Sequence, residues 1–150
     1  MRDFTLRCLQ QLYESILSNG YQVIPYEQYA SQNLRRGKYV ILRHDVDAKP
    51  EQAHKVATIE RQLGISSSFY IRNKEDVYKK DIVSGIASLG HEIGYHYEDF
   101  ARYRGDAGMA IRSFESFLAE LRTVYPVKTI CMHGSPLSKY NNHDIWKSYN

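Results

Sequence analysis

The chain has 150 residues and a formal net charge of +3, with 43% hydrophobic and 25% charged residues, which fits one globular domain over residues 1–150 that can bury a core. Its basic residues are scattered and form no stripe or known module, so we expect no nucleic-acid partner. Cys8 and Cys131 suggest no disulfide framework, no run approaches the roughly 20 apolar residues that span a bilayer, and residues 1–20 carry charges where a secretory signal would be apolar. We therefore expect a cytoplasmic protein.

The first third of the chain predicts a helix, an irregular or helical segment and two strands. Leu6, Leu9 and Tyr13 recur at helical spacing on one face, and Gly20 supplies a stop for that helix. In chain order, the predicted elements are a helix over residues 3–18, a strand over 21–24, a short helix or loop over 26–37 and a strand over 39–47.

Helices and strands alternate regularly in the rest of the chain. Pro50 fits the first turn of a helix, and Asp106 is a suitable residue to cap a later one. This β-α-β-α order with short loops predicts an α/β fold with a parallel sheet or barrel. The predicted elements are helices over residues 50–63, 76–89 and 106–124, and strands over 65–71, 91–96 and 128–132.

Three ionisable side chains, His44, Asp45 and Asp47, end the predicted strand 39–47. Because side chains alternate along a strand, Asp45 and Asp47 point the same way. A single Asp after a strand is often only a turn former or a helix cap. Three such groups after an apolar run are costly to desolvate unless something pairs them, so they predict a site at the carboxyl end of the strand.

Other strands end in similar groups. His96 and Glu98 follow one predicted strand, and His133 follows another. The carboxyl ends of parallel strands share one edge of a sheet, so these groups are expected to converge. An Asp with two His is a common ligand set for Zn²⁺ and suits other first-row metals. Cys131 can share the face of His133, but a strand cysteine is more often a small hydrophobic residue.

Three segments resemble polysaccharide deacetylases of the NodB-homology type, which are carbohydrate esterase family 4-like. They are Ile-Leu-Arg-His-Asp-Val-Asp, Gly-His-Glu-Ile-Gly-Tyr-His-Tyr-Glu and Cys-Met-His-Gly-Ser-Pro, in that order. The resemblance covers residues 20–146 and is closest to an intracellular bacterial branch. It implies a distorted (β/α) barrel that removes N-acetyl groups from a carbohydrate substrate with a divalent metal.

The resemblance also implies roles for individual residues. It makes Asp45 the catalytic base, and Asp47 and His96 metal ligands. Where the family usually has another ligand histidine, this chain has Phe100. We expect His133 to take its place, with Glu98 as the second choice. The expected metal is Zn²⁺, with Co²⁺, Mn²⁺ and Ni²⁺ as alternatives.

Further residues at the strand ends are candidates for contact with the substrate. His44 or His133 is the candidate donor of a proton to the leaving amine. The residues expected to bind the carbohydrate are Arg43, Arg72, Tyr97 and Glu98.

Family members continue with further strands after the Cys-Met-His-Gly-Ser-Pro segment. The resemblance therefore implies a domain that is truncated relative to the family and a barrel that is incomplete at its C-terminus. The open edge of such a sheet is suited to pairing with a second copy in a homodimer. Phe100 and the short length also support an alternative, a catalytically inactive relative that binds a carbohydrate or a protein. Another metal hydrolase, such as a phosphoesterase, is a third hypothesis, since fold does not fix function.

Overall fold

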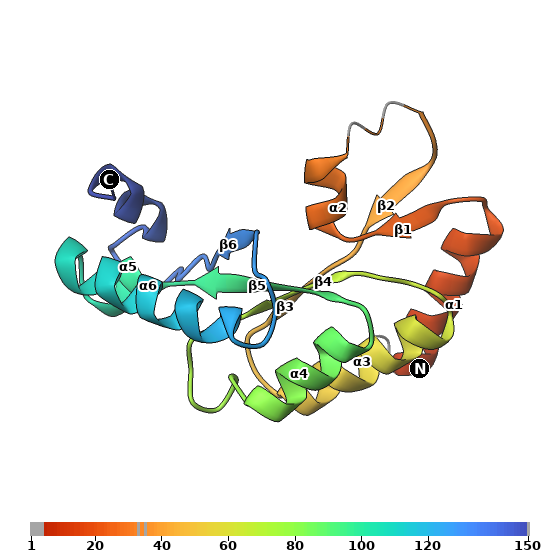
Figure 1. The fold of residues 1–150 in the computed structure, drawn as a ribbon, viewed down its shortest axis with the longest axis horizontal. Helices are drawn as coiled ribbons and strands as arrows, with labels where there is room; N and C mark the ends of the chain where they lie inside the picture. Colours follow the sequence, from red (N-terminus) through yellow and green to blue (C-terminus); the bar gives the residue numbers. More distant parts are fainter. Residues whose placement is uncertain (1–4, 33, 35, 150) are drawn as a thin grey trace.

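The computed structural model describes residues 5–32, 34 and 36–149, which fold into parallel sheets and helices (Figure 1). In this part of the chain, β1 (Gln22–Ile24) pairs only with β2 (Tyr39–Ile41). The main sheet has the order β3-β4-β5-β6, and every neighbouring pair in it is parallel. Its strands are β3 (Arg43–Val46), β4 (Ser68–Ile71), β5 (Glu92–Tyr97) and β6 (Ile130–Met132).

The helices begin where the sequence supplies suitable residues. The Thr5 side chain accepts from the Cys8 amide at the start of the first helix, and the Asp106 side chain caps the longest helix by accepting from the Met109 amide. Pro50 occupies the first turn of the third helix. The helices are α1 (Leu6–Ser18), α2 (Tyr26–Ser31), α3 (Pro50–Gln62), α4 (Lys80–Ser88), α5 (Asp99–Arg102), α6 (Ala107–Arg122) and the 3₁₀ helix η1 (Asn142–Lys147).

The main sheet has an apolar face that packs against helices. Phe69 and Ile93 are partners in register on this face, and both are fully buried. In Figure 1, α3 and α4 lie on one side of the sheet, and β1, β2 and α2 lie on the other. The core on the helical side contains Val46, Ala57, Phe69, Ile71, Val83, Ile86, Ile93, Tyr95, Phe114, Phe117 and Leu121.

The opposite face of the main sheet is polar, and α2 covers its amino-terminal end. The Tyr26 amide donates to Ser68 Oγ at 2.8 Å, and the Glu27 amide donates to Glu92 Oε2 at 2.9 Å. The amides of α2 thus satisfy buried side-chain oxygens at the beginning of β4 and β5. Other polar side chains gather at the carboxyl ends of the strands. We call this side the polar face; it carries Arg43, Asp45, Ser68, Tyr70, Glu92, Gly94, His96 and Cys131.

The predicted α/β class with a parallel sheet is confirmed, but one predicted strand is wrong in its extent. The segment 39–47 is divided at Leu42 into β2 and β3, which belong to different sheets. Val40 pairs with Val23 in β1, whereas Asp45 pairs with Tyr70 in β4. The apolar run in the sequence gives no sign of this change of partner strand. The sequence also gave no prediction of α5 or η1.

The main sheet is an open half-barrel in the described residues. Within it, β3 pairs only with β4 and β6 only with β5, so the sheet does not close on itself. A complete barrel of the expected kind is therefore not formed by these strands. None of the described helices is long and apolar enough to cross a membrane.

Candidate metal centre

The carboxyl edge of the main sheet brings together one carboxylate and two imidazoles. Asp47 follows β3, His96 lies in β5, and His133 follows β6. The His133 amide donates to the Tyr97 carbonyl at 2.8 Å, which continues the β5–β6 pairing to this point. Asp47 Oδ1 lies 3.6 Å from His96 Nε2 and 3.6 Å from His133 Nε2. The three ligand atoms lie within 4.8 Å of one another, so a single cation can contact all three.

His96 is oriented for ligation through Nε2. Its side chain is only 3% exposed, and its Nδ1 lies 3.1 Å from the Cys131 carbonyl oxygen. Donation by Nδ1–H to that carbonyl leaves the Nε2 lone pair facing Asp45 and Asp47. Burial lowers the pKa of His96, and the charges of the two carboxylates offset this only in part. The imidazole is therefore neutral near pH 7, which is the form that binds metals.

The loop after β6 holds the His133 ring. Its Nδ1 lies 3.1 Å from Ser135 Oγ and 3.5 Å from Glu98 Oε2. Asn142 in η1 donates to the His133 carbonyl at 2.8 Å and to Ser135 Oγ at 3.0 Å. The Ser135 amide donates to His133 Nδ1 at 3.2 Å, and a neutral ring in this arrangement carries its proton on Nε2. Ligation through Nε2 therefore requires the other tautomer, in which Nδ1–H donates to Ser135 Oγ or Glu98 instead.

Asp45 lies beside this cluster on the polar face. Its Oδ2 is 3.7 Å from His96 Nε2, and its carboxylate accepts from Arg43 Nε at 2.8 Å and Nη2 at 2.5 Å. Burial raises the pKa of Asp45, but the hydrogen bonds from Arg43 and the neighbouring His96 outweigh it and hold the pKa below its ordinary value. Asp45 is therefore an ionised carboxylate near pH 7, able to accept a proton.

Arg72 and Glu98 form the rim of the site. Arg72 donates to Glu98 Oε1 from Nε at 3.2 Å and to Oε2 from Nη2 at 2.5 Å, and its Nη1 lies 3.6 Å from Asp47 Oδ1. Burial raises the pKa of Glu98, but the hydrogen bond and charge of Arg72 lower it more. Arg72 thus binds both carboxylate oxygens of Glu98. Glu98 Oε2 also lies 3.5 Å from His133 Nδ1, the ring nitrogen on the side away from Asp47. The ligand cluster therefore contains His133 and not Glu98.

Two expected site residues, His44 and Tyr97, lie on the other face of the sheet. His44 Nε2 lies 2.7 Å from Glu60 Oε1, and its ring stacks on Phe69 at 4.5 Å between centroids. Tyr97 is 4% exposed, and its hydroxyl accepts from Trp146 Nε1 at 2.8 Å. Strand alternation explains both placements, because each is an odd number of residues from Asp45 or His96. The structure therefore brings neither of them to the cluster.

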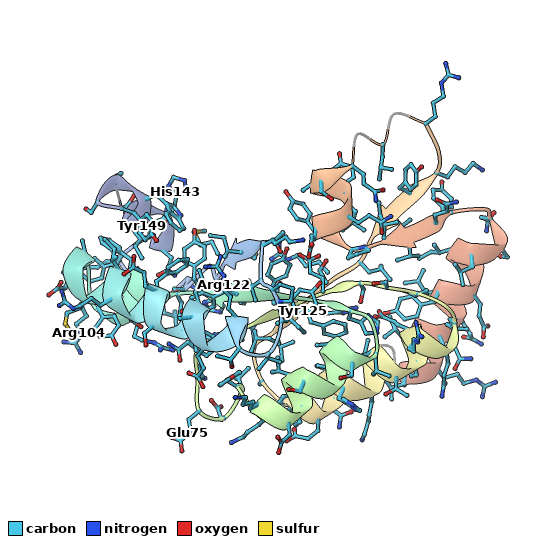
Figure 2. All side chains as sticks on the ribbon, viewed as in Figure 1. Glu75, Arg104, Arg122, Tyr125, His143 and Tyr149 are labelled. Atoms are coloured by element: carbon cyan, nitrogen blue, oxygen red, sulfur yellow. The ribbon has the colours of Figure 1, made fainter. Side chains whose placement is uncertain are left out.

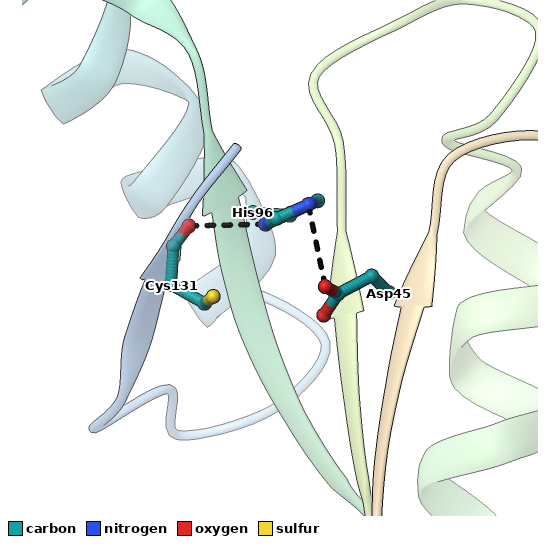
Figure 3. Close-up of side chains that lie close together, drawn as sticks. All are labelled: Asp45, His96 and Cys131. Atoms are coloured by element: carbon teal, nitrogen blue, oxygen red, sulfur yellow. Dashed lines mark hydrogen bonds and ion pairs between the residues drawn. The ribbon is translucent and has the colours of Figure 1, made fainter. Parts of the chain in front are cut away.

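Cys131 lies beside the ligand cluster, which its interpretation as a small hydrophobic residue does not predict. Its Sγ, a carboxylate oxygen of Asp45 and a ring nitrogen of His96 lie within 4.8 Å of one another. Figure 3 shows the thiol turned toward the Asp45 carboxylate beneath the His96 ring. The available signal was its spacing of two residues from His133, which placed it on the same face.

A groove of about 450 Å³ adjoins His133 and offers space for a substrate. Glu98 and Arg102 provide charged groups in its lining, and the turn that follows His133 provides the rest. A larger, mostly apolar hollow of about 610 Å³ lies between α1 and α3, and none of its lining residues belongs to the cluster. Another hollow of about 340 Å³ is lined in part by Arg43 and Asp45, but of these three spaces only the groove beside His133 is lined by a residue of the ligand cluster. Its full lining is Glu98, Ala101, Arg102, His133, Ser135, Pro136, Leu137 and Ser138.

One comparison with known proteins, that with solved structures, supports the fold. No family model and no curated protein matches the sequence. Among solved structures, the chain is similar to the deacetylase PplD from Streptococcus pyogenes in complex with acetate, with a TM-score of 0.61 and 12% sequence identity. The match covers 82% of this chain and 59% of that one, so the chain spans about three fifths of that deacetylase's length. The class of protein that the comparison defines is an α/β protein with a deacetylase-like fold.

Proposed function

We propose that the protein is a metal-dependent hydrolase that removes N-acetyl groups from a carbohydrate. The observation that carries this proposal is the convergence of Asp47, His96 and His133 beside the Asp45 carboxylate. The cluster lies at the carboxyl edge of a parallel sheet, where α/β proteins commonly bind ligands. The deacetylase-like fold supports the choice of reaction.

The donor set fits a catalytic divalent ion. Two imidazole nitrogens and one carboxylate oxygen match the three protein ligands of catalytic zinc sites, which leave a position open for substrate or water. The same atoms also suit Co²⁺, Mn²⁺ or Ni²⁺. A metal held there would polarise the acetyl carbonyl and make the attacking water more acidic. Asp47 is half exposed, so the site is reachable from solvent.

Asp45 is the proposed general base. It is ionised near pH 7 and lies 3.7 Å from His96 Nε2, so it can take a proton from water that approaches the ligand cluster. Since His44 faces the helices and His133 is proposed as a ligand, protonated Asp45 is the proposed group that returns the proton to the leaving amine. Arg43 keeps the Asp45 carboxylate in place through two hydrogen bonds.

The groove beside His133 is the proposed carbohydrate subsite. Arg102 and Glu98 supply a donor and an acceptor for sugar hydroxyls at one side of it. Arg72 links Glu98 to Asp47 and so holds the rim of this subsite next to the metal ligands. These contacts favour a neutral polar ligand, because the arginine charges are already partly balanced by Glu98.

Metal content tests the ligand assignment. The Cys131→Ser chain is used, so that the nearby thiol cannot substitute for a lost ligand. We expect about one equivalent of Zn²⁺ by mass spectrometry, and loss of this metal when Asp47→Asn is added. Asp76→Asn is the matched control, since the Asp76 side chain is 69% exposed and pairs with Lys74. Unchanged zinc in the Asp47→Asn protein would refute the site.

Release of acetate tests the reaction. The zinc-loaded protein is incubated with N-acetylglucosamine oligomers, and acetate is measured enzymatically. Acetate release that depends on Asp45 and Asp47 supports the proposal. Bound zinc with turnover of phosphate esters alone would favour the phosphoesterase hypothesis. Carbohydrate binding without any bound metal would favour the inactive binding domain.

A further inference from the structure

A second set of metal-ligating atoms surrounds His96 on the side facing Cys131. The Asp45 carboxylate, the His96 ring and Cys131 Sγ form a triad whose atoms lie within 4.8 Å of one another (Figure 3). Ligand atoms around a tetrahedral Zn²⁺ are separated by roughly 3.3–3.8 Å, given bond lengths of about 2.0–2.3 Å. The His96 Nε2 to Asp45 Oδ2 distance of 3.7 Å is within this range.

Strand pairing fixes the triad in place. Cys131 is the register partner of His96 in the β5–β6 pair, and Asp45 projects from β3 on the same polar face. Gly94, two residues before His96, makes room for the Tyr70 ring of the neighbouring strand, because a Cβ there would lie 2.4 Å from that ring. All three side chains are thus presented by strands rather than by mobile loops.

Contacts among the described residues give the Cys131 thiol no other clear structural role. It forms no disulfide, and it is not part of the hydrophobic core. Its polar contact is a weak one, 3.7 Å from Sγ to the Met132 carbonyl oxygen. A thiol that is half-buried among a carboxylate and an imidazole is better suited to ligation than to packing.

We propose that Asp45, His96 and Cys131 form a second metal position that prefers thiophilic ions such as Zn²⁺, Co²⁺ and Cd²⁺. On binding, the thiol proton leaves to solvent, and a sulfur–metal bond forms in its place. The position excludes the Asp47–His96–His133 position, because His96 Nε2 has a single lone pair. It also occupies Asp45, so an ion bound there inhibits the hydrolase; this consequence rests on the proposed function, whereas the binding itself does not.

Arg43 opposes cation binding at this second position. Its Nη2 hydrogen-bonds to Asp45 Oδ2, the oxygen that faces His96 Nε2. The Arg43 side chain is 49% exposed and can withdraw into solvent when a metal arrives. Removal of this charge should tighten binding about tenfold, the effect of deleting one partly solvated charge next to a carboxylate ligand.

Co²⁺ absorption tests the position directly in the Asp47→Asn protein, where the first cluster lacks its carboxylate ligand. We expect a near-ultraviolet thiolate-to-Co²⁺ charge-transfer band that disappears when Cys131→Ser is added. The band should persist when Cys8→Ser is added, since Cys8 lies in α1. Arg43→Met in the same background should lower the Co²⁺ dissociation constant about tenfold.

The outcomes separate this proposal from the proposed function. Absence of the band in Asp47→Asn protein, or its survival in the Cys131→Ser variant, would overturn the second position. Two equivalents of Co²⁺ in the otherwise unaltered protein would overturn the exclusion through His96. Loss of zinc binding in the Cys131→Ser chain would instead contradict the proposed function. It would not bear on the Co²⁺ band of the Asp47→Asn protein, which tests the second position. If both hold, Cd²⁺ inhibits acetate release by the unaltered protein but not by the Cys131→Ser variant.

Discussion

Phe100 occupies the position where the sequence resemblance to polysaccharide deacetylases implies a ligand histidine. In the structure it lies in α5, packed partly against the core, with its ring 6.3 Å from that of Tyr140. His133 comes from a different strand, and its Nε2 is the nitrogen that faces Asp47. At the scale of single residues, we therefore propose that His133, which is distant in sequence, takes the place of a local ligand.

A pair of substitutions tests this replacement in the Cys131→Ser chain. His133→Gln should weaken Zn²⁺ binding at least tenfold, because one of three ligands is lost. Phe100→His should not restore it, since its ring belongs to the α5 packing. His143→Gln is the control, as His143 lies exposed in η1 (Figure 2). Competition with a zinc-sensitive dye measures all three, and recovery of affinity by Phe100→His would contradict the assignment.

Arg43 is expected to set the acidic limb of the pH profile. Asp45 acts as a base only when ionised, so activity is present above its pKa and is lost as pH falls through it. Arg43→Met removes the hydrogen bonds that lower this pKa, while burial continues to raise it. The acidic limb of acetate release should therefore move to higher pH. Arg7→Met, on an exposed position of α1, should leave it in place.

At the scale of elements, the buried carboxylate of Glu60 joins α3 to α1 and to β3. It accepts from the Tyr13 hydroxyl at 2.5 Å, from Ser67 Oγ at 2.5 Å and from His44 Nε2 at 2.7 Å. Glu60 is fully buried, and such a group is stable only when its oxygens are satisfied. Because His44 precedes Asp45, this network supports the strand that presents the proposed base.

Loss of the Glu60 carboxylate should destabilise the fold. Glu60→Ala is expected to lower the free energy of unfolding by about 3 kcal/mol, because it leaves buried donors without a partner. Glu51→Ala, at an exposed position of the same helix, should change it little. Urea denaturation followed by circular dichroism measures both. Equal stabilities would contradict the role given to this network.

The same network predicts a pH dependence of stability. Burial raises the pKa of Glu60, but hydrogen bonding to His44 and its charge, with help from Ser67 and Tyr13, hold the pKa below its ordinary value. The stabilisation is therefore fully present above the unfolded value of about 4.3 and is lost as pH falls through the lower folded pKa. The stability difference between the unaltered protein and Glu60→Gln should shrink in acid.

At the scale of the whole molecule, the main sheet is open at β3 and β6. Ile130 and Met132 at the β6 edge are 39% and 37% exposed. An exposed apolar edge strand is a template for pairing with another chain. The homodimer stays a prediction, and light scattering after size exclusion tests it. We expect a dimer that Ile130→Lys converts to a monomer, and a monomer at every concentration would contradict it.

The sequence alone determined the order of elements and much of the site. Helical spacing predicted α3 and α6, and the Asp106 cap was placed correctly. The two-residue period placed Asp45 and Asp47 on one side of their strand, and parallel order predicted that His96 and His133 would lie near them. These features could be predicted because they depend on local periodicity and on chain direction.

Only the tertiary structure decided which groups are close enough to act together. The division at Leu42 depends on pairing with β1 and β4, which lie on opposite sides of it in the sequence. Packing of α3 covers the face that carries His44, and the pairing of β6 with β5 places Cys131 next to His96 on the face that carries Asp45. Strand partners and the distances between side chains are set by non-local contacts, and no local pattern encodes them.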